Sequence, residues 1–229
     1  MLESKMEMET LRPAIYQAVM MWSDSHYERF LFRKDPGRLI EDEDKNYKFD
    51  WFKWFVIDWR VARTIKEGKL EDVRKYLDNE FRKPLETGNE GRTVDNAAQA
   101  IRDNGWSAID SKNGNGPRSL VSKIGFFLKP KAIIPYDRFS RDGLCICTDG
   151  KFKKNGSYCD YLKAFNDLFD AVDAQIRDAL MDPRVTDLAK RFRCPDEKLD
   201  LPEFRRKVLD NYLMEKGRDM GKRKKKQSG

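Results

Sequence analysis

Apolar residues recur at helical spacing through most of this 229-residue chain. Intervals of three and four positions separate them over residues 10–34, and the same period returns further along. Glycine and proline interrupt the pattern between these segments. The pattern predicts an all-α protein with helices over residues 10–34, 70–81, 93–102, 120–128, 158–181 and 203–216.

The most aromatic segment lies between Phe49 and Ile65 and includes Trp51, Trp54 and Trp59. Such aromatic density is typical of a helix that is buried on several sides. We therefore predict that this segment contributes to the core.

A glycine-rich turn precedes the predicted helix over 120–128. Gly114 and Gly116 flank Asn115, and Pro117 follows. Glycine tolerates positive φ, and proline is suited to a first helical turn, so this grouping predicts a sharp turn that opens a helix.

The segment after this helix leads to a single carboxylate. Pro130 ends the helix, and residues 131–136 are too apolar for a free loop and, with Pro135, too constrained for a helix. We predict a buried extended connection that holds Asp137 at a fixed position.

Basic residues dominate the region around this turn. No acidic residue lies between Asp110 and Asp137, so the region is predicted to face phosphate. The chain carries a formal net charge of +7, most of it in the six basic residues and one acid after residue 217. The basic residues of the acid-free window are Lys112, Arg118, Lys123, Lys129 and Lys131.

The turn, helix and connection resemble the signature of the helix-hairpin-helix DNA glycosylases, in particular 8-oxoguanine glycosylase-like members, over about Gly105 to Leu144. Gly114 and Gly116 resemble the hairpin glycines of that family. Pro135 resembles the proline before the catalytic acid, and Asp137 the acid itself. The resemblance implies two helical lobes with the active cleft between them, formed by residues 1–217 as one domain.

The same resemblance implies a base-excision enzyme. Bifunctional members carry a nucleophilic lysine where this chain has Arg118, and a guanidinium cannot form a Schiff base. We therefore expect a monofunctional glycosylase that flips a modified base out of DNA, hydrolyses its N-glycosidic bond and leaves an abasic site. Its role would be DNA repair, or antiviral defence against phage whose DNA carries modified bases.

Asp137 is the expected catalytic residue, as the carboxylate beside the developing oxocarbenium ion. Its other possible use is as a helix N-cap, because Arg138, Phe139 and Ser140 follow it. The expected DNA-binding residues are Gly114, Asn115, Gly116, Arg118, Ser119, Lys123, Arg138 and Arg141.

No metal or cofactor is expected. The four cysteines lie at positions 145, 147, 159 and 194, and only the first two are closely spaced, unlike zinc or cluster ligands. We interpret them as reduced thiols. The single histidine, His26, is expected to have a packing or surface role.

Double-stranded DNA is the expected partner of a monomeric, cytoplasmic protein with no contact to a membrane. Residues 218–229 are predicted to form a disordered basic tail that raises DNA affinity.

Two other functions fit the sequence. A non-enzymatic helix-hairpin-helix DNA-binding module needs the glycine turn and the basic surface but not Asp137. A nuclease would need clustered acids for metal ions, for which Asp142, Asp149 and Asp160 are available without a recognisable spacing. The aromatic segment offers a further alternative, since one of its rings could line a pocket for the extruded base.

Overall fold

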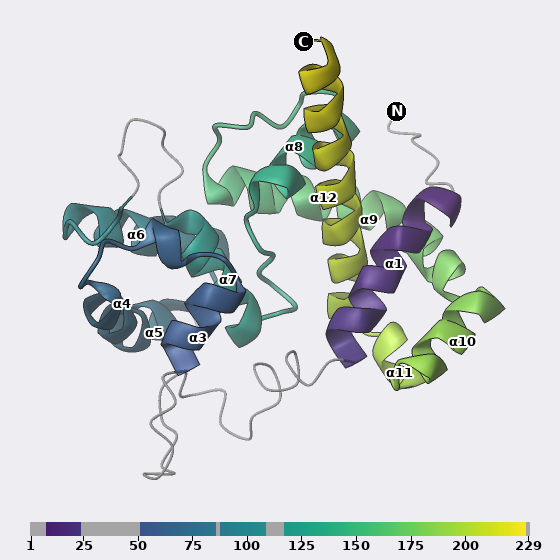
Figure 1. The fold of residues 1–229 in the computed structure, drawn as a ribbon, viewed down its shortest axis with the longest axis horizontal. Coiled ribbons are helices and arrows are strands. Elements are labelled where there is room, and N and C mark those ends of the chain that lie inside the picture. Colours follow the sequence, from purple (N-terminus) through teal and green to yellow (C-terminus); the bar gives the residue numbers. More distant parts are fainter. Residues whose placement is uncertain (1–7, 24–50, 86–87, 109–116, 228–229) are drawn as a thin grey trace. The chain divides into compact units, whose positions relative to one another are not determined.

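Helices make up nearly all the regular structure in the computed structural model, which describes residues 8–23, 51–85, 88–108 and 117–227. Within these ranges no strand forms, and an isolated bridge joins Ile65 to Ser107. The prediction of an all-α protein is confirmed. The α-helices, shown in Figure 1, are α1 (Met8–Ser23), α3 (Trp51–Asp58), α4 (Leu70–Tyr76), α5 (Arg82–Leu85), α6 (Glu90–Asp103), α7 (Arg118–Leu128), α8 (Arg138–Cys147), α9 (Tyr158–Leu180), α10 (Pro183–Arg191), α11 (Asp196–Leu199) and α12 (Pro202–Gln227). A short 3-10 helix covers Ala62–Thr64, and a π-helical turn, Leu77–Phe81, joins α4 to α5.

The described residues divide into two compact units. Unit 1 contains α1, α8, α9 from Asp160 onward, and α10 to α12. Unit 2 contains α3 to α7, the residues that follow α7 as far as Pro135, and residues 157–159. The sequence predicted one domain over residues 1–217, and the described part of that range forms both units.

Helix α12 is the centre of unit 1. Every residue from Phe204 to Leu213 is buried, although the sequence pattern predicted an amphipathic helix. Buried charges require partners. Arg205 donates to Asp173 at 2.6 Å and Arg206 to Asn166 at 2.8 Å, both on α9. These contacts allow residues 204–213 of α12 to be enclosed on all sides.

Helices α8 and α12 approach each other closely because two glycines lie where they cross. A Cβ on Gly143 of α8 would collide with the carbonyl oxygen of Leu213, and a Cβ on Gly217 of α12 with that of Phe139. Beside them, Ser140 donates to Asp210 at 2.6 Å, and Lys207 donates to the other oxygen of Asp210. Steric fit and a buried polar network therefore fix α8 against α12.

Unit 2 has an aromatic core, as the sequence predicted. Phe55 of α3 contacts the ring of Phe127 on α7 edge-on, with the ring centroids 5.5 Å apart. Trp59 contacts the same ring at 4.9 Å. Phe52 and Phe55 are almost fully buried. The contacts support a packing role for these rings. Whether one of them also lines a pocket for an extruded base stays untested.

Several boundaries differ from the sequence prediction. Helix α1 ends at Ser23 in the described part, and residues 24–34 of the predicted helix, with His26, lie outside the described residues. Helices α10 and α11 were not predicted. The expected disordered tail at 218–229 is helical in the structure through Gln227, because α12 continues into it. Lysine and arginine are good helix formers, and the guanidinium of Arg218 lies 5.5 Å from the centre of the Phe139 ring.

None of the helices in the described part of the chain is long and apolar enough to span a membrane.

Candidate functional site

Asp137 is the N-cap of α8. Its backbone is extended, with φ −105° and ψ 153°, and its carboxylate accepts a hydrogen bond from the backbone N–H of Phe139 at 2.8 Å. The side chain is half-buried. Among the described residues, the carboxylate has no other hydrogen-bond or ion-pair partner, so one oxygen is held while the other is available.

Residues 133–136, before Asp137, are buried and form neither helix nor strand, as predicted. Lys131 and Ala132, which the prediction included, lie in a turn and are exposed and half-buried respectively. In unit 2, the buried hydroxyl of Tyr158 donates to the carbonyl of Ile134 at 2.8 Å and accepts from its N–H at 3.1 Å. In unit 1, the hydroxyl of Tyr136 donates to the carbonyl of Gly156 at 3.3 Å. Both ends of the connection are therefore fixed, each within its own unit.

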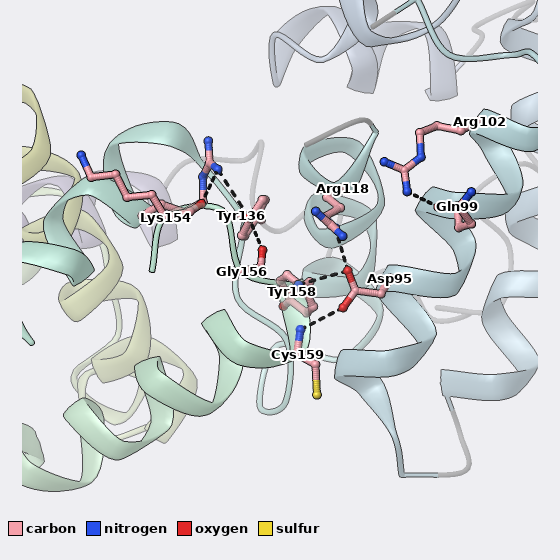
Figure 2. A network of polar contacts seen from close by, with 10 residues as sticks. Asp95, Gln99, Arg102, Arg118, Tyr136, Lys154, Gly156, Tyr158 and Cys159 are labelled. Carbon is pink, nitrogen blue, oxygen red and sulfur yellow. Dashed lines mark hydrogen bonds and ion pairs between the residues drawn. The ribbon is translucent and has the colours of Figure 1, made fainter. Parts of the chain in front are cut away.

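Arg118, at the start of α7, is paired with Asp95 on α6 (Figure 2). Its Nε donates to Asp95 Oδ1 at 2.6 Å, and the two side chains are only 14% and 18% exposed. Asp95 also accepts from the backbone N–H groups of Tyr158 and Cys159, both at 3.0 Å. The carboxylate of Asp95 thus caps the start of α9, and Arg118 neutralises it.

Two other basic residues of the acid-free window also have partners in unit 2. Lys123 donates to the carbonyl of Trp59 at 3.0 Å and lies 5.8 Å from the centre of its ring. Lys129 forms an ion pair with Glu90 at 3.1 Å. Partial burial opposes ionisation of Glu90, but hydrogen bonds from its own backbone and from Lys129 outweigh it, so the pKa of this carboxyl is lowered. Acids on α6 thereby compensate the positive charge.

The two arginines after Asp137 differ in their surroundings. Arg141 donates to the carbonyl of Lys154 at 3.1 Å, and its guanidinium lies 4.7 Å from the centre of the Tyr136 ring. Arg138 is exposed and has no partner within the described part of the chain. Arg138 is therefore the better placed of the two to contact an external anion.

The structure groups the predicted residues by unit. Asp137, Arg138 and Arg141 lie together at the start of α8 in unit 1, whereas Arg118, half-buried Ser119 and Lys123 belong to unit 2. The hairpin residues Gly114, Asn115 and Gly116 lie outside the described residues.

Two residues of this region were not predicted from the sequence. Asp95 holds the start of α9, and Tyr158 holds the connection through Ile134. No local pattern marks them, because each acts on residues far away in the chain. Trp106, at the end of the segment before the hairpin, packs edge-on against Tyr76 with the ring centroids 6.0 Å apart.

The cysteines are free thiols: Cys145 and Cys147 are half-buried, Cys159 is exposed and Cys194 is buried. Within the described ranges, no group of three or more histidine, cysteine or acidic side chains is arranged to hold a metal ion. Asp142, one of the acids considered for a nuclease, is paired with Lys154 at 2.8 Å.

No protein-family model, no curated protein and no solved structure matches this chain. The resemblance to helix-hairpin-helix glycosylases therefore rests on the residues from Gly105 to Leu144 alone.

Proposed function

We propose that this chain is a monofunctional DNA glycosylase. It extrudes a modified nucleotide from the duplex and hydrolyses its N-glycosidic bond, leaving an abasic site, in DNA repair or in defence against phage with modified DNA. A base inside the stack is out of reach of a side chain, so such an enzyme must grip the backbone and expose a carboxylate to the flipped nucleotide.

The observation that carries the proposal is the state of Asp137. The Phe139 N–H holds one carboxylate oxygen, while the other has no partner among the described residues. A buried, proline-containing connection fixes the backbone before it. Such a carboxylate has a defined orientation and can stabilise the positive charge that develops on the sugar as the base departs. It can also orient or deprotonate the attacking water.

A water nucleophile is supported by the two basic residues of α7. Arg118 stands where bifunctional relatives carry lysine, and its permanently charged guanidinium has no lone pair to attack a sugar. Lys123, the nearest amine along the helix, donates to the Trp59 carbonyl. The product is therefore expected to be an intact strand with an abasic site, which breaks only in alkali.

Arg138 is the proposed phosphate contact next to the site. It is exposed on the first turn of α8, adjacent to Asp137. Half or more of the hydrogen bonds between proteins and DNA go to the sugar–phosphate backbone of the DNA. Arg141 instead supports the surrounding loop through Lys154 and Tyr136.

One observation favours the alternative of a non-enzymatic DNA-binding module. The hydrogen bond from Phe139 gives Asp137 a structural use as an N-cap, which needs no chemistry. The two functions differ in whether free base is released.

The test is a base-release assay on duplex oligonucleotides that carry a panel of oxidised and phage-type modified bases. Mass spectrometry detects the free base, and alkali reveals the abasic site. Asp137→Asn retains the cap acceptor but loses the charge, and we expect it to reduce base release by about a hundredfold or more while DNA binding persists. Asp182→Asn is the matched control, because Asp182 caps α10 through the N–H of Arg184 at 2.9 Å.

Base release at the wild-type rate by Asp137→Asn would show that the carboxylate is not catalytic. DNA binding with no base released from any substrate of the panel would favour the binding module. Borohydride added during turnover should trap no protein–DNA adduct, and an adduct that disappears in Lys123→Ala would identify Lys123 as a nucleophile.

A further inference from the structure

A groove with a volume of about 520 Å³ lies in unit 1 between the loop 148–156 and the first half of α9. Small-molecule sites in proteins commonly measure about 300–1,000 Å³, so the groove is large enough for a compact organic ligand. Asp137 is not among the residues that line it.

The floor of the groove is apolar. Phe152 and Leu168 are 4% and 2% exposed, and Ala164, which also lines the groove, is half-buried. The Phe152 ring is held edge-on against Tyr161, with the ring centroids 5.8 Å apart. This floor offers a flat ligand an apolar surface that includes an aromatic ring.

The loop that forms one wall is held at both ends. Thr148 Oγ1 donates to the carbonyl of Leu144 at 2.8 Å and accepts from the N–H of Phe152 at 3.3 Å. At the other end, the carbonyl of Gly156 accepts from the hydroxyl of Tyr136. Because these hydrogen bonds come from the protein itself, they hold the loop in place, and binding does not have to order it.

Three lysines stand at the rim: Lys151 and Lys153 on the loop, and Lys163 on α9. All three are exposed, and none of their ammonium groups has an ion-pair or hydrogen-bond partner among the described residues. Lys154, on the same loop, is by contrast paired with Asp142 at 2.8 Å. Three residues that line the groove therefore carry ammonium groups that are available to an anion.

Two aspartates also line the groove. Asp160, Lys163, Ala164 and Asp167 follow one face of α9 at intervals of three and four residues. The lysines outnumber the acids, which leaves the rim weakly positive, and a carboxylate can accept hydrogen bonds from amino or hydroxyl groups of a ligand.

We propose that this groove binds a nucleotide, with its phosphate at the rim lysines and its base on the floor made by Phe152, Ala164 and Leu168. An anion joined to a flat, largely apolar group matches both parts of the groove. The nucleotide can come from a DNA strand or be free in solution, and the two sources share this chemistry. The inference does not depend on the proposed base excision.

Isothermal titration with 2′-deoxynucleoside 5′-monophosphates, the matching nucleosides and a short single-stranded oligonucleotide tests the proposal. We expect the phosphorylated ligand to bind about tenfold more tightly than the nucleoside, because its contacts to lysine are charge-assisted. Lys163→Gln should weaken binding several-fold, and Asp167→Asn should strengthen it. Lys190→Gln, which removes an exposed lysine from α10, is the matched control and should change nothing.

Ala164→Leu is a second variant, which narrows the groove without changing its charge and should weaken binding of mononucleotide and oligonucleotide alike. Thermal melting checks that each variant is folded. Lys163-dependent binding of mononucleotides would identify a free nucleotide as a ligand, and binding of the oligonucleotide alone would identify a DNA strand.

Equal affinity of Lys163→Gln and Lys190→Gln for every ligand would overturn the proposal. It would also be overturned if neither the mononucleotide nor the oligonucleotide bound at millimolar concentration. Asp137→Asn should bind nucleotides as the wild type does. The nucleotide-binding measurement therefore tests the groove even if the protein releases no base from DNA.

Discussion

Arg118 and Asp95 form an ion pair, with 2.6 Å between Nε and Oδ1, across a separation of 23 residues in the chain. The pair joins α7 to α6, and Asp95 also accepts the first two N–H groups of α9 (Figure 2). A residue that the sequence assigned to DNA phosphate therefore has a protein carboxylate as its partner.

This network should contribute measurably to stability. We expect Asp95→Ala to lower the free energy of unfolding by about 2 kcal/mol or more, because it removes the largely buried carboxylate that pairs with Arg118 Nε and accepts from two helix-start N–H groups. Arg118→Ala should cost less, since Asp95 keeps its two backbone donors. Urea unfolding followed by circular dichroism measures both.

Asp187→Ala, on the exposed surface of α10, is the control for Asp95 and should stay within about 0.5 kcal/mol of the wild type. The double variant of Asp95 and Arg118 should be less destabilised than the sum of the single variants. Additive effects would show that the ion pair contributes nothing to stability.

The crossing of α8 and α12 should not tolerate a methyl group at Gly143. A Cβ there would meet the Leu213 backbone, which cannot move without displacing α12, so we expect Gly143→Ala to destabilise the protein by about 3 kcal/mol or more. Gly125→Ala in α7 is the comparison, because its nearest neighbour is the end of the Ile133 side chain at 2.8 Å. Thermal unfolding should show a much smaller loss for Gly125→Ala, and equal losses would refute the steric explanation.

The basic end of α12 should strengthen DNA binding without reading sequence. A chain that stops after Gly221 retains the contact between Arg218 and Phe139 but loses five basic residues at positions 222–226. We expect weaker affinity for every duplex and a log–log salt slope that is shallower by roughly one unit or more, since each phosphate neutralised contributes about 0.9. Fluorescence anisotropy at several salt concentrations measures the slope, and an unchanged slope would contradict the prediction.

Cys147 should be unreactive at moderately alkaline pH. Burial, and to a smaller extent Asp149, raise the pKa of its thiol to about 11, whereas Lys216 lowers it. The thiolate is the reactive form, so its fraction at pH 8 is roughly a hundredfold below that of an ordinary thiol. Labelling with iodoacetamide followed by peptide mass spectrometry should modify the exposed Cys159 much faster than Cys147.

The raised pKa of the Cys147 thiol also makes the stability of the folded protein depend on pH. The folded protein holds the Cys147 proton more tightly than the unfolded chain does, so the stabilisation is complete below about pH 9, the ordinary thiol value, and is lost as the pH rises through about 11. In urea all four cysteines should react at similar rates. Rapid labelling of Cys147 in the folded protein at pH 8 would contradict its burial.

Local order was predictable wherever neighbouring residues control it. The helical period over 120–128 and 158–181 corresponds to α7 and α9, because amphipathic spacing is a property of consecutive residues. Pro130 and Pro135 exclude a helix in the connection, and Asp137 is followed by a helix that it can cap, so the non-helical segment and the N-cap could both be predicted from the sequence.

The partners of the charged side chains depended on tertiary structure. The window around Arg118 contains no acid, yet Asp95 and Glu90 from α6 compensate Arg118 and Lys129. The burial of residues 204–213 of α12 could not be predicted from the sequence either. Four of the residues from Arg205 to Asp210 are charged, and they are buried only because α9 and α8 supply partners for them. Sequence alone determined where helices form around Asp137. Only the fold decided which charges meet, because an ion pair depends on distance in space, and residues 23 positions apart acquire a fixed distance only when their helices pack.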